Sequence, residues 1–271
     1  MQATVTVDPK MAGARRAWTG GSWEPLQGTS EEGMPNWLRE KMRLCVPLLS
    51  SGYESTLIMR LCADEALSAA PGKRPLTIGE LGSNWGPDMR DTLLARYAFR
   101  SREEAVELYE TARDQWYAED PDTWLDAAGT FYDGAIGAVR EVMADDTSSA
   151  TSVYVLTSKS HEAARALLSA SGLELDDEHV LSGIQGDAAK AARLAELRQQ
   201  HAEATLAFVD DSVPPLRAVA NHLGLFGAEL YHARWGYSTP QQQAEAAAMP
   251  RVRGLGPESA DLVTVLRDGE A

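Results

Sequence analysis

The sequence predicts an α/β protein in which a helical unit precedes a parallel sheet flanked by helices. Apolar residues at helical spacing dominate before about residue 150, and short β-branched runs alternate with helices after it. Hydrophobic residues make up 44% of the 271 residues, which is enough for a buried core. Strands that alternate with helices of about 10–15 residues favour βαβ units and therefore a parallel sheet.

The first half has helical patterning and almost no strand-like run. Tyr53, Leu57 and Leu61 recur one helical turn apart and form one apolar face. Ser101, with Glu104 three residues later, is typical of a helix N-terminus. The expected helices are residues 37–47, a helix around 53–62, one from 101 to 116, and 131–143. The glycines at 79, 82 and 86 are interpreted as breaks between helices.

The second half has four expected strands, each followed by a helix. The strands are residues 152–156, 179–182, 205–209 and 228–234, all expected in one mostly parallel sheet. The helices contain Ala163–Leu168, residues 187–200, Val213–Leu223 and residues 239–248. The expected domains are an N-terminal segment over 1–30, a helical unit over 31–130 and a sheet-containing unit over 131–271.

The composition excludes several classes of protein. The 25 Lys and Arg residues against 40 Asp and Glu give a net charge of −15, which repels nucleic acids and anionic membranes. No apolar run reaches the roughly 18 residues that a membrane span needs. The two cysteines, Cys45 and Cys62, are too few for a disulfide framework or a structural zinc site. We expect a soluble intracellular protein, with cytoplasm and plastid both open.

Polar residues follow the expected strands at the places where parallel sheets bind ligands. Thr157 and Ser158 follow the first strand, and Asp210-Asp211 end the third. Lys190 lies in the first turns of the helix between them. Carboxylates are ligands for Mg²⁺, hydroxyls at a helix start hold phosphate, and lysine neutralises a transferring phosphoryl group. The set therefore predicts a phosphoryl-transfer site.

Each of these residues also has a simpler interpretation. Asp210-Asp211 can be a solvated pair that caps the next helix, and Thr157-Ser158 a turn with an N-cap. Lys190 can be a surface lysine. The five histidines lack metal-ligand spacing and are interpreted as ordinary surface or partly buried residues. Only the ordered set of hydroxyl, lysine and paired aspartates favours the functional interpretation.

The same order of residues resembles the haloacid dehalogenase-like (HAD) superfamily. Thr157-Ser-Lys159, Lys190 and Asp210-Asp211 resemble its second, third and fourth motifs. The closer resemblance is to the HAD-like proteins of plants, algae and cyanobacteria. It rests on Ser51–Leu61, Asn84-Trp85, Trp124 with Phe131-Tyr132, Thr157–Lys159, and Arg234–Thr239 followed by Ala-Ala-Ala-Met-Pro250. These matches span roughly residues 35–255.

The resemblance implies a Rossmann-like core with an inserted helical cap. It also implies Mg²⁺, a phospho-aspartyl intermediate and a small phosphorylated metabolite as the substrate. In that case Thr157, with Ser158, holds the phosphate, Lys190 stabilises its charge, and Asp210 and Asp211 bind the metal.

One motif departs from the family pattern. The family's first strand ends in Asp-x-Asp, whose aspartates are the nucleophile and the general acid and base. Here the only apolar run before the helical unit is Ala3–Val7, followed by Asp8-Pro-Lys10. Either Asp8 stands at the nucleophile position, with Lys10 in place of the second aspartate, or the first strand is missing from this chain.

Two functions follow from this departure. The first is a Mg²⁺-dependent HAD-type phosphatase of a small organic phosphate, or a degenerate version with little activity. The second is a catalytically silent HAD-fold protein that acts as a binding or assembly subunit for a protein partner. The retained Thr157, Lys190 and Asp210-Asp211 favour the first, and the absent Asp-x-Asp favours the second. A phosphoacceptor receiver domain ranks far behind, because its acidic pair follows the first strand.

Overall fold

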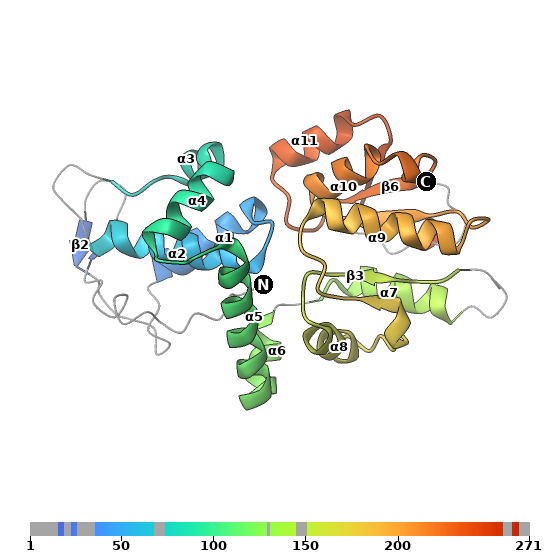
Figure 1. The fold of residues 1–271 in the computed structure, drawn as a ribbon, viewed down its shortest axis with the longest axis horizontal. Helices are drawn as coiled ribbons and strands as arrows, with labels where there is room; N and C mark the ends of the chain where they lie inside the picture. The colour runs from blue at the N-terminus through green and yellow to red at the C-terminus, as the bar shows by residue number, and fades with distance from the viewer. Residues whose placement is uncertain are drawn as a thin grey trace. The chain divides into compact units, whose positions relative to one another are not determined.

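The computed structural model shows a mixed α/β protein that is mostly helical and contains small parallel sheets (Figure 1). It describes residues 16–18, 23–25, 36–67, 74–128, 131–144, 151–256 and 262–265. The chain divides into two compact units, Met1–Ala128 and Gly129–Ala271, which are described separately below. Within the described ranges, no helix combines the length and the apolar character needed to cross a membrane.

The described part of the first unit is built almost entirely from helices. A short antiparallel ribbon of β1 (Arg16–Trp18) and β2 (Trp23–Pro25) comes first. The helices are α1 (Asn36–Cys45), a 3-10 turn η2 (Val46–Leu48), α2 (Gly52–Leu67), α3 (Ile78–Asn84), α4 (Pro87–Arg96), α5 (Arg102–Glu119) and α6 (Pro121–Ala128). One hydrophobic core, centred on the fully buried Leu57, Ile58 and Leu81, joins helices α1 to α5.

N-terminal capping residues fix where helices α3 and α5 begin. The Ser101 side chain accepts a hydrogen bond from the Glu104 N–H, which confirms the expected start of α5. The interpretation of Gly79 and Gly82 as helix breaks is wrong, because both lie inside α3. Thr77 and Glu80 form a reciprocal capping box that satisfies the first free N–H groups and starts α3 despite the glycines.

The second unit alternates strands with helices. Its strands are β3 (Val155–Leu156), β4 (Val180–Leu181), β5 (Ala207–Asp210), β6 (Glu229–Ala233) and β7 (Val252–Leu255). Its helices are α7 (Asp133–Met143), α8 (His161–Ala170), the 3-10 turn η3 (Asp177–His179), α9 (Asp187–Gln200), α10 (Val213–Ala220), the 3-10 turn η4 (Leu223–Leu225) and α11 (Pro240–Ala248).

All strand pairs of the second unit are parallel, as expected, but they form two sheets. β3 pairs with β4, and β5, β6 and β7 pair in that order. The expectation of one sheet is therefore wrong for the described residues, because no ladder joins β3 to β5. The sequence also did not reveal β7. The segment that could have lain between the sheets, Thr4–Val7, falls outside the described residues.

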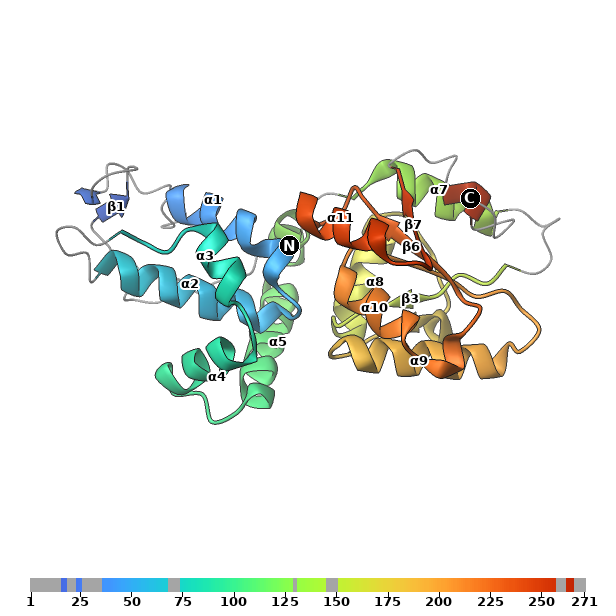
Figure 2. The same ribbon diagram turned by 90° about the horizontal axis from the view of Figure 1, so that it is seen from above.

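Helices cover both faces of these strands (Figures 1 and 2). Leu156 of β3 and Phe208 of β5 pack into one cluster with α9 and α10. On the opposite face, Val153 and Val209 pack into a cluster with α7. Because side chains alternate along a strand, the two sheets share the same two helical layers.

The strands of the second unit differ in how deeply they are buried. Both residues of β3 and three of the four in β5 are only partly buried. In contrast, both residues of β4 and four of the five in β6 are buried. In a parallel sheet covered on both faces, inner strands are normally buried. The partial burial of β3 and β5 agrees with the position of each strand at an edge of its sheet.

Candidate functional site

The expected lysine and aspartate meet where β5 ends. Asp210 is the last residue of β5, and Lys190 lies in the first turns of α9. The Lys190 Nζ lies 2.8 Å from Asp210 Oδ2, although the residues are 20 positions apart. The N-cap Gly186 has a φ of +90°, a conformation that favours glycine, and it directs the chain into α9. We call Lys190, Asp210 and Asp211 the strand-end site.

Burial controls the electrostatics of Asp210. Its side chain is only 10% exposed, and burial raises the pKa of its carboxyl above the ordinary value. Lys190 and the Ser212 N–H, 2.9 Å from Oδ1, act in the opposite direction. The neighbouring Asp211 also raises this pKa, but it contributes less than the other groups.

Asp211 is held by the loop that follows β6. The Tyr237 N–H donates to Asp211 Oδ2 over 2.6 Å. Gly236 lies so close that an added Cβ would come within 2.2 Å of the Asp211 Cβ, so only glycine fits there. His232 Nε2 lies 3.2 Å from the Asp211 carbonyl oxygen. Asp211 Oδ1 has no hydrogen-bond partner among the described residues, which leaves it available for a ligand.

His232 itself differs from what the sequence suggested. It is 1% exposed, so the interpretation of all five histidines as surface or partly buried residues is wrong for this one. It lies in β6, where its neighbours are also buried. Its role is to support the backbone of Asp211.

Thr157 and Ser158 follow β3 but do not contact the acidic pair. The Thr157 Oγ accepts a hydrogen bond from the Lys159 N–H over 3.2 Å, which forms a turn. The Ser158 carbonyl accepts from Gln185 Nε2 over 3.0 Å. In the described part of the chain, no hydrogen bond joins Thr157 or Ser158 to Lys190 or Asp210. The structure thus brings Lys190 and Asp210 together and leaves the hydroxyls on the other sheet.

Among the described residues, the acidic pair offers carboxylate oxygens but not a full set of protein ligands for a metal ion. Mg²⁺ commonly uses one or two carboxylates, several waters and substrate phosphate oxygens. Asp211 Oδ1 accepts no hydrogen bond in the described part of the chain, and each oxygen of Asp210 accepts one and keeps a second lone pair. The described residues hold no group of three His, Cys, Asp or Glu that could bind a metal alone. A magnesium ion at this position would therefore need waters or a phosphate group to complete its ligands.

Aromatic side chains near Asp211 were not among the expected site residues. Tyr237 is 46% exposed and Tyr132, at the N-cap of α7, is 45% exposed. Burial raises the pKa of Tyr132, and the nearby Tyr237 and Asp211 raise it further. Both tyrosines lie in segments that resemble HAD-like proteins, Phe131-Tyr132 and Arg234–Thr239. Their position in these segments could have marked them as candidate site residues from sequence alone.

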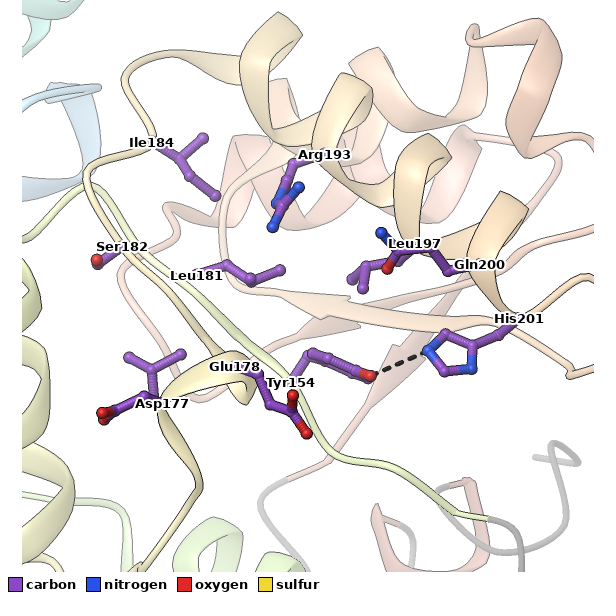
Figure 3. A pocket seen from close by; sticks show the side chains of 11 residues that line it. Tyr154, Asp177, Glu178, Leu181, Ser182, Ile184, Arg193, Leu197, Gln200 and His201 are labelled. Atoms are coloured by element: carbon purple, nitrogen blue, oxygen red, sulfur yellow. Dashed lines mark hydrogen bonds between the residues drawn. The ribbon is translucent and has the colours of Figure 1, made fainter.

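A separate cavity of about 840 Å³ lies between α9 and the β3–β4 sheet (Figure 3). Arg193 of α9 points toward the strands, and Glu178 and Asp177 come from η3. The Tyr154 hydroxyl lies 3.0 Å from His201 Nε2 at its edge. None of Thr157, Ser158, Lys190, Asp210 or Asp211 lines this cavity.

The cysteines lie in the core, as expected. Both are buried in the first unit and neither forms a disulfide. Burial raises the pKa of Cys45 to about 11 and that of Cys62 to about 12. Neither thiol is ionised at neutral pH, so neither is a nucleophile candidate. Asp8, the expected nucleophile, lies outside the described residues.

Comparison of the chain with protein-family models, curated proteins and solved structures gave no match. The functional argument therefore depends on the residues of the strand-end site.

Proposed function

We propose that the strand-end site binds the phosphate group of a small organic phosphate together with Mg²⁺. The protein is then a HAD-type phosphatase, or a degenerate version of one with little activity. The contact between Lys190 and Asp210 carries this proposal. It pairs a cation with a buried carboxylate at the carboxyl edge of a parallel strand, where such sheets bind ligands.

Lys190 supplies positive charge to the bound phosphate. Its ammonium group has three donors, and the hydrogen bond to Asp210 uses one of them. Its side chain is 21% exposed, so a ligand can reach the remaining donors. Bound Mg²⁺ would neutralise phosphate charge while Asp210 and Asp211 hold the ion. Thr157 and Ser158 would bind the phosphate from the other sheet.

We also propose that β3–β4 and β5–β7 are two parts of one Rossmann-like sheet. Their shared helical layers and the partial burial of β3 and β5 support a position for one further strand. Thr4–Val7 is the segment of this chain with a suitable apolar pattern, and it would place Asp8 at the strand end. Residues 31–130 would then be the inserted helical cap.

Thermal unfolding tests the binding proposal. A ligand at 100 times its Kd stabilises the folded protein by about 2.7 kcal/mol. We expect millimolar Mg²⁺ with inorganic phosphate to raise Tm in the unmodified protein. The increase should be lost in Lys190→Gln and reduced in Asp211→Asn.

Lys41→Gln is the matched control. Lys41 forms an ion pair of similar type with Glu65 at 3.3 Å, but in the helical unit. This variant should keep the full response to Mg²⁺ and phosphate. An unmodified protein that does not respond, or a Lys190→Gln variant that responds equally, would contradict the proposal.

The silent assembly subunit is the second candidate, and one surface favours it. Leu223 is 96% exposed and Phe226 is 85% exposed, beside η4. The loop is held firmly, because Leu225 is buried and Arg251 donates to the Leu225 and Ala228 carbonyls. Large apolar side chains held in solvent are typical of contact surfaces.

Sedimentation velocity tests whether this surface binds a second copy of the chain. We expect concentration-dependent association that the double change Leu223→Ser with Phe226→Ser abolishes. Leu108→Ser, at a 54% exposed leucine of α5, is the control that should leave association unchanged. A protein that stays monomeric, or a double variant that associates normally, removes this candidate.

A further inference from the structure

Large aromatic side chains gather in the sequence segments that border the strand-end site. Phe131 is 39% exposed, Tyr132 45% and Tyr237 46%. By contrast, Tyr231 in the same unit is 0% exposed. Exposed aromatic rings next to polar groups that can bind a ligand are typical of small-molecule sites, because the rings supply apolar contact area.

The backbone fixes where Tyr237 lies. Its N–H donates to Asp211 Oδ2 over 2.6 Å, and Gly236 packs against the Asp211 side chain. Trp235, in the same loop, packs on the hydrophobic cluster that holds α7. The loop is therefore anchored on both sides of Gly236, and the backbone of Tyr237 is held against Asp211.

Tyr132 is fixed by the start of α7. It is the N-cap residue of this helix, and Ala135, one turn later, packs on the same cluster as Trp235. The first turn of α7 and the loop after β6 therefore share one support. The electrostatic effect of Tyr237 and Asp211 on the Tyr132 hydroxyl is consistent with this proximity.

We propose that Tyr132 and Tyr237 bind a planar aromatic ring carried by the phosphate ester, and so select aryl or nucleoside phosphates. This inference rests on the proposed function, because the strand-end site has to hold the phosphate. The two carboxylates disfavour a second anionic group beside the phosphate, whereas a neutral ring can stack on the phenol faces. An aliphatic phosphate has no flat face to offer them.

Calorimetric titration in the presence of Mg²⁺ tests the proposal with four probes. These are inorganic phosphate, glycerol 1-phosphate, phenyl phosphate and adenosine monophosphate. Stacking of a base on one aromatic side chain changes affinity by about 5-fold or more. We expect phenyl phosphate and adenosine monophosphate to bind at least about 5-fold more tightly than glycerol 1-phosphate.

The double variant Tyr132→Leu with Tyr237→Leu should remove this preference. It keeps apolar bulk and the Tyr237 backbone N–H, so inorganic phosphate should bind with unchanged Kd. Phe226→Leu is the matched control, since Phe226 is an exposed aromatic residue beside η4. This control should keep the full preference for aromatic phosphates.

The outcomes separate the two proposals. If inorganic phosphate binds but aromatic phosphates bind no more tightly than glycerol 1-phosphate, the aromatic subsite is wrong and the proposed function stands. A preference that survives in the double variant also overturns the subsite. If none of the four probes binds, the proposed function fails and the subsite fails with it. A preference for only one of the two aromatic probes identifies the source of the ring.

Discussion

The two units each bury a carboxylate, but they surround it differently. Glu54 in α2 is 0% exposed, and its oxygens accept from the Ser50 N–H and hydroxyl, Trp85 Nε1 and Arg90. Asp210 at the end of β5 is 10% exposed and accepts from two groups, Lys190 and the Ser212 N–H. A carboxylate with four donors is complete, whereas one with two can still take a ligand.

The difference follows from the architecture of each unit. Glu54 lies among helices whose side chains converge on one core, so partners from three segments reach it. Asp210 lies where a parallel strand ends, and its hydrogen-bond donors among the described residues come from the start of α9 and from its own turn. A carboxylate at a strand end therefore keeps lone pairs that can bind a ligand, whereas one in a helical core has all of them occupied by donors. The following predictions test this contrast.

The largest expected effect concerns catalysis at the strand-end site, where Asp210 and Asp211 can still take a ligand. We predict that the chain hydrolyses an aryl phosphate very slowly, because Lys190, Asp210 and Asp211 bind charge but provide no acid and base. Loss of a general acid and base costs about 10²–10⁴-fold. Steady-state release of phosphate measures the rate. Replacement of residues 3–10 by an apolar strand that ends in Asp-x-Asp-Gly should raise it.

Asp8→Asn is the control in the unmodified chain. If the chain turns over at an ordinary rate, about 10 per second, the prediction of low activity is wrong. If Asp8→Asn then abolishes that rate, Asp8 is the nucleophile and Thr4–Val7 forms the strand beside β5.

The second prediction concerns Glu54, the buried carboxylate that accepts hydrogen bonds from four donors. Glu54→Gln should lower the free energy of unfolding by about 3 kcal/mol, since it leaves Arg90 without its buried partner. Urea unfolding followed by circular dichroism measures this. Glu40→Gln should change stability by less than about 0.5 kcal/mol, because the Glu40 side chain is 64% exposed. Equal changes in the free energy of unfolding for the two variants would show that the hydrogen bonds of Glu54 do not stabilise the fold.

The sequence predicted the strand-end side of this contrast but not the burial of Glu54. The order of a strand, a helix and a second strand was enough to bring Lys190 to Asp210, because a helix that follows a parallel strand starts at the edge where such strands end. Apolar spacing likewise located α2, and the Ser101 cap located the start of α5. These features depend on residues close together in sequence.

Features set by tertiary contacts escaped prediction. β7 has only two apolar residues, Val252 and Leu255, and pairing with β6 makes it a strand. Local sequence did not reveal how deeply β6 buries His232, because burial depends on the layers above and below. The division into two sheets depends on which strands pair with each other, and no local pattern encodes that pairing.

The smallest expected effect is a difference in pKa between Asp210 at the strand end and Glu80 on the surface of the helical unit. Nuclear magnetic resonance of the carboxyl carbons should give Asp210 a pKa above its ordinary value of about 3.9, because burial outweighs Lys190. Glu80, which accepts from Arg74 and Thr77 on the surface of the helical unit, should have a pKa of about 2.

The two shifts have opposite effects on stability. The pKa of Glu80 is lower in the folded state, so its contribution is present above about pH 4.3 and is lost as the pH falls toward 2. The pKa of Asp210 is higher in the folded state, so its burial penalty grows as the pH rises from about 3.9 through the folded value. Lys190→Met should raise the pKa of Asp210 further, and Glu80→Gln should leave Asp210 unchanged. If the pKa of Asp210 lies below its ordinary value, the ion pair with Lys190 outweighs burial. Asp210 is then less able to take a ligand than its two hydrogen-bond donors indicate.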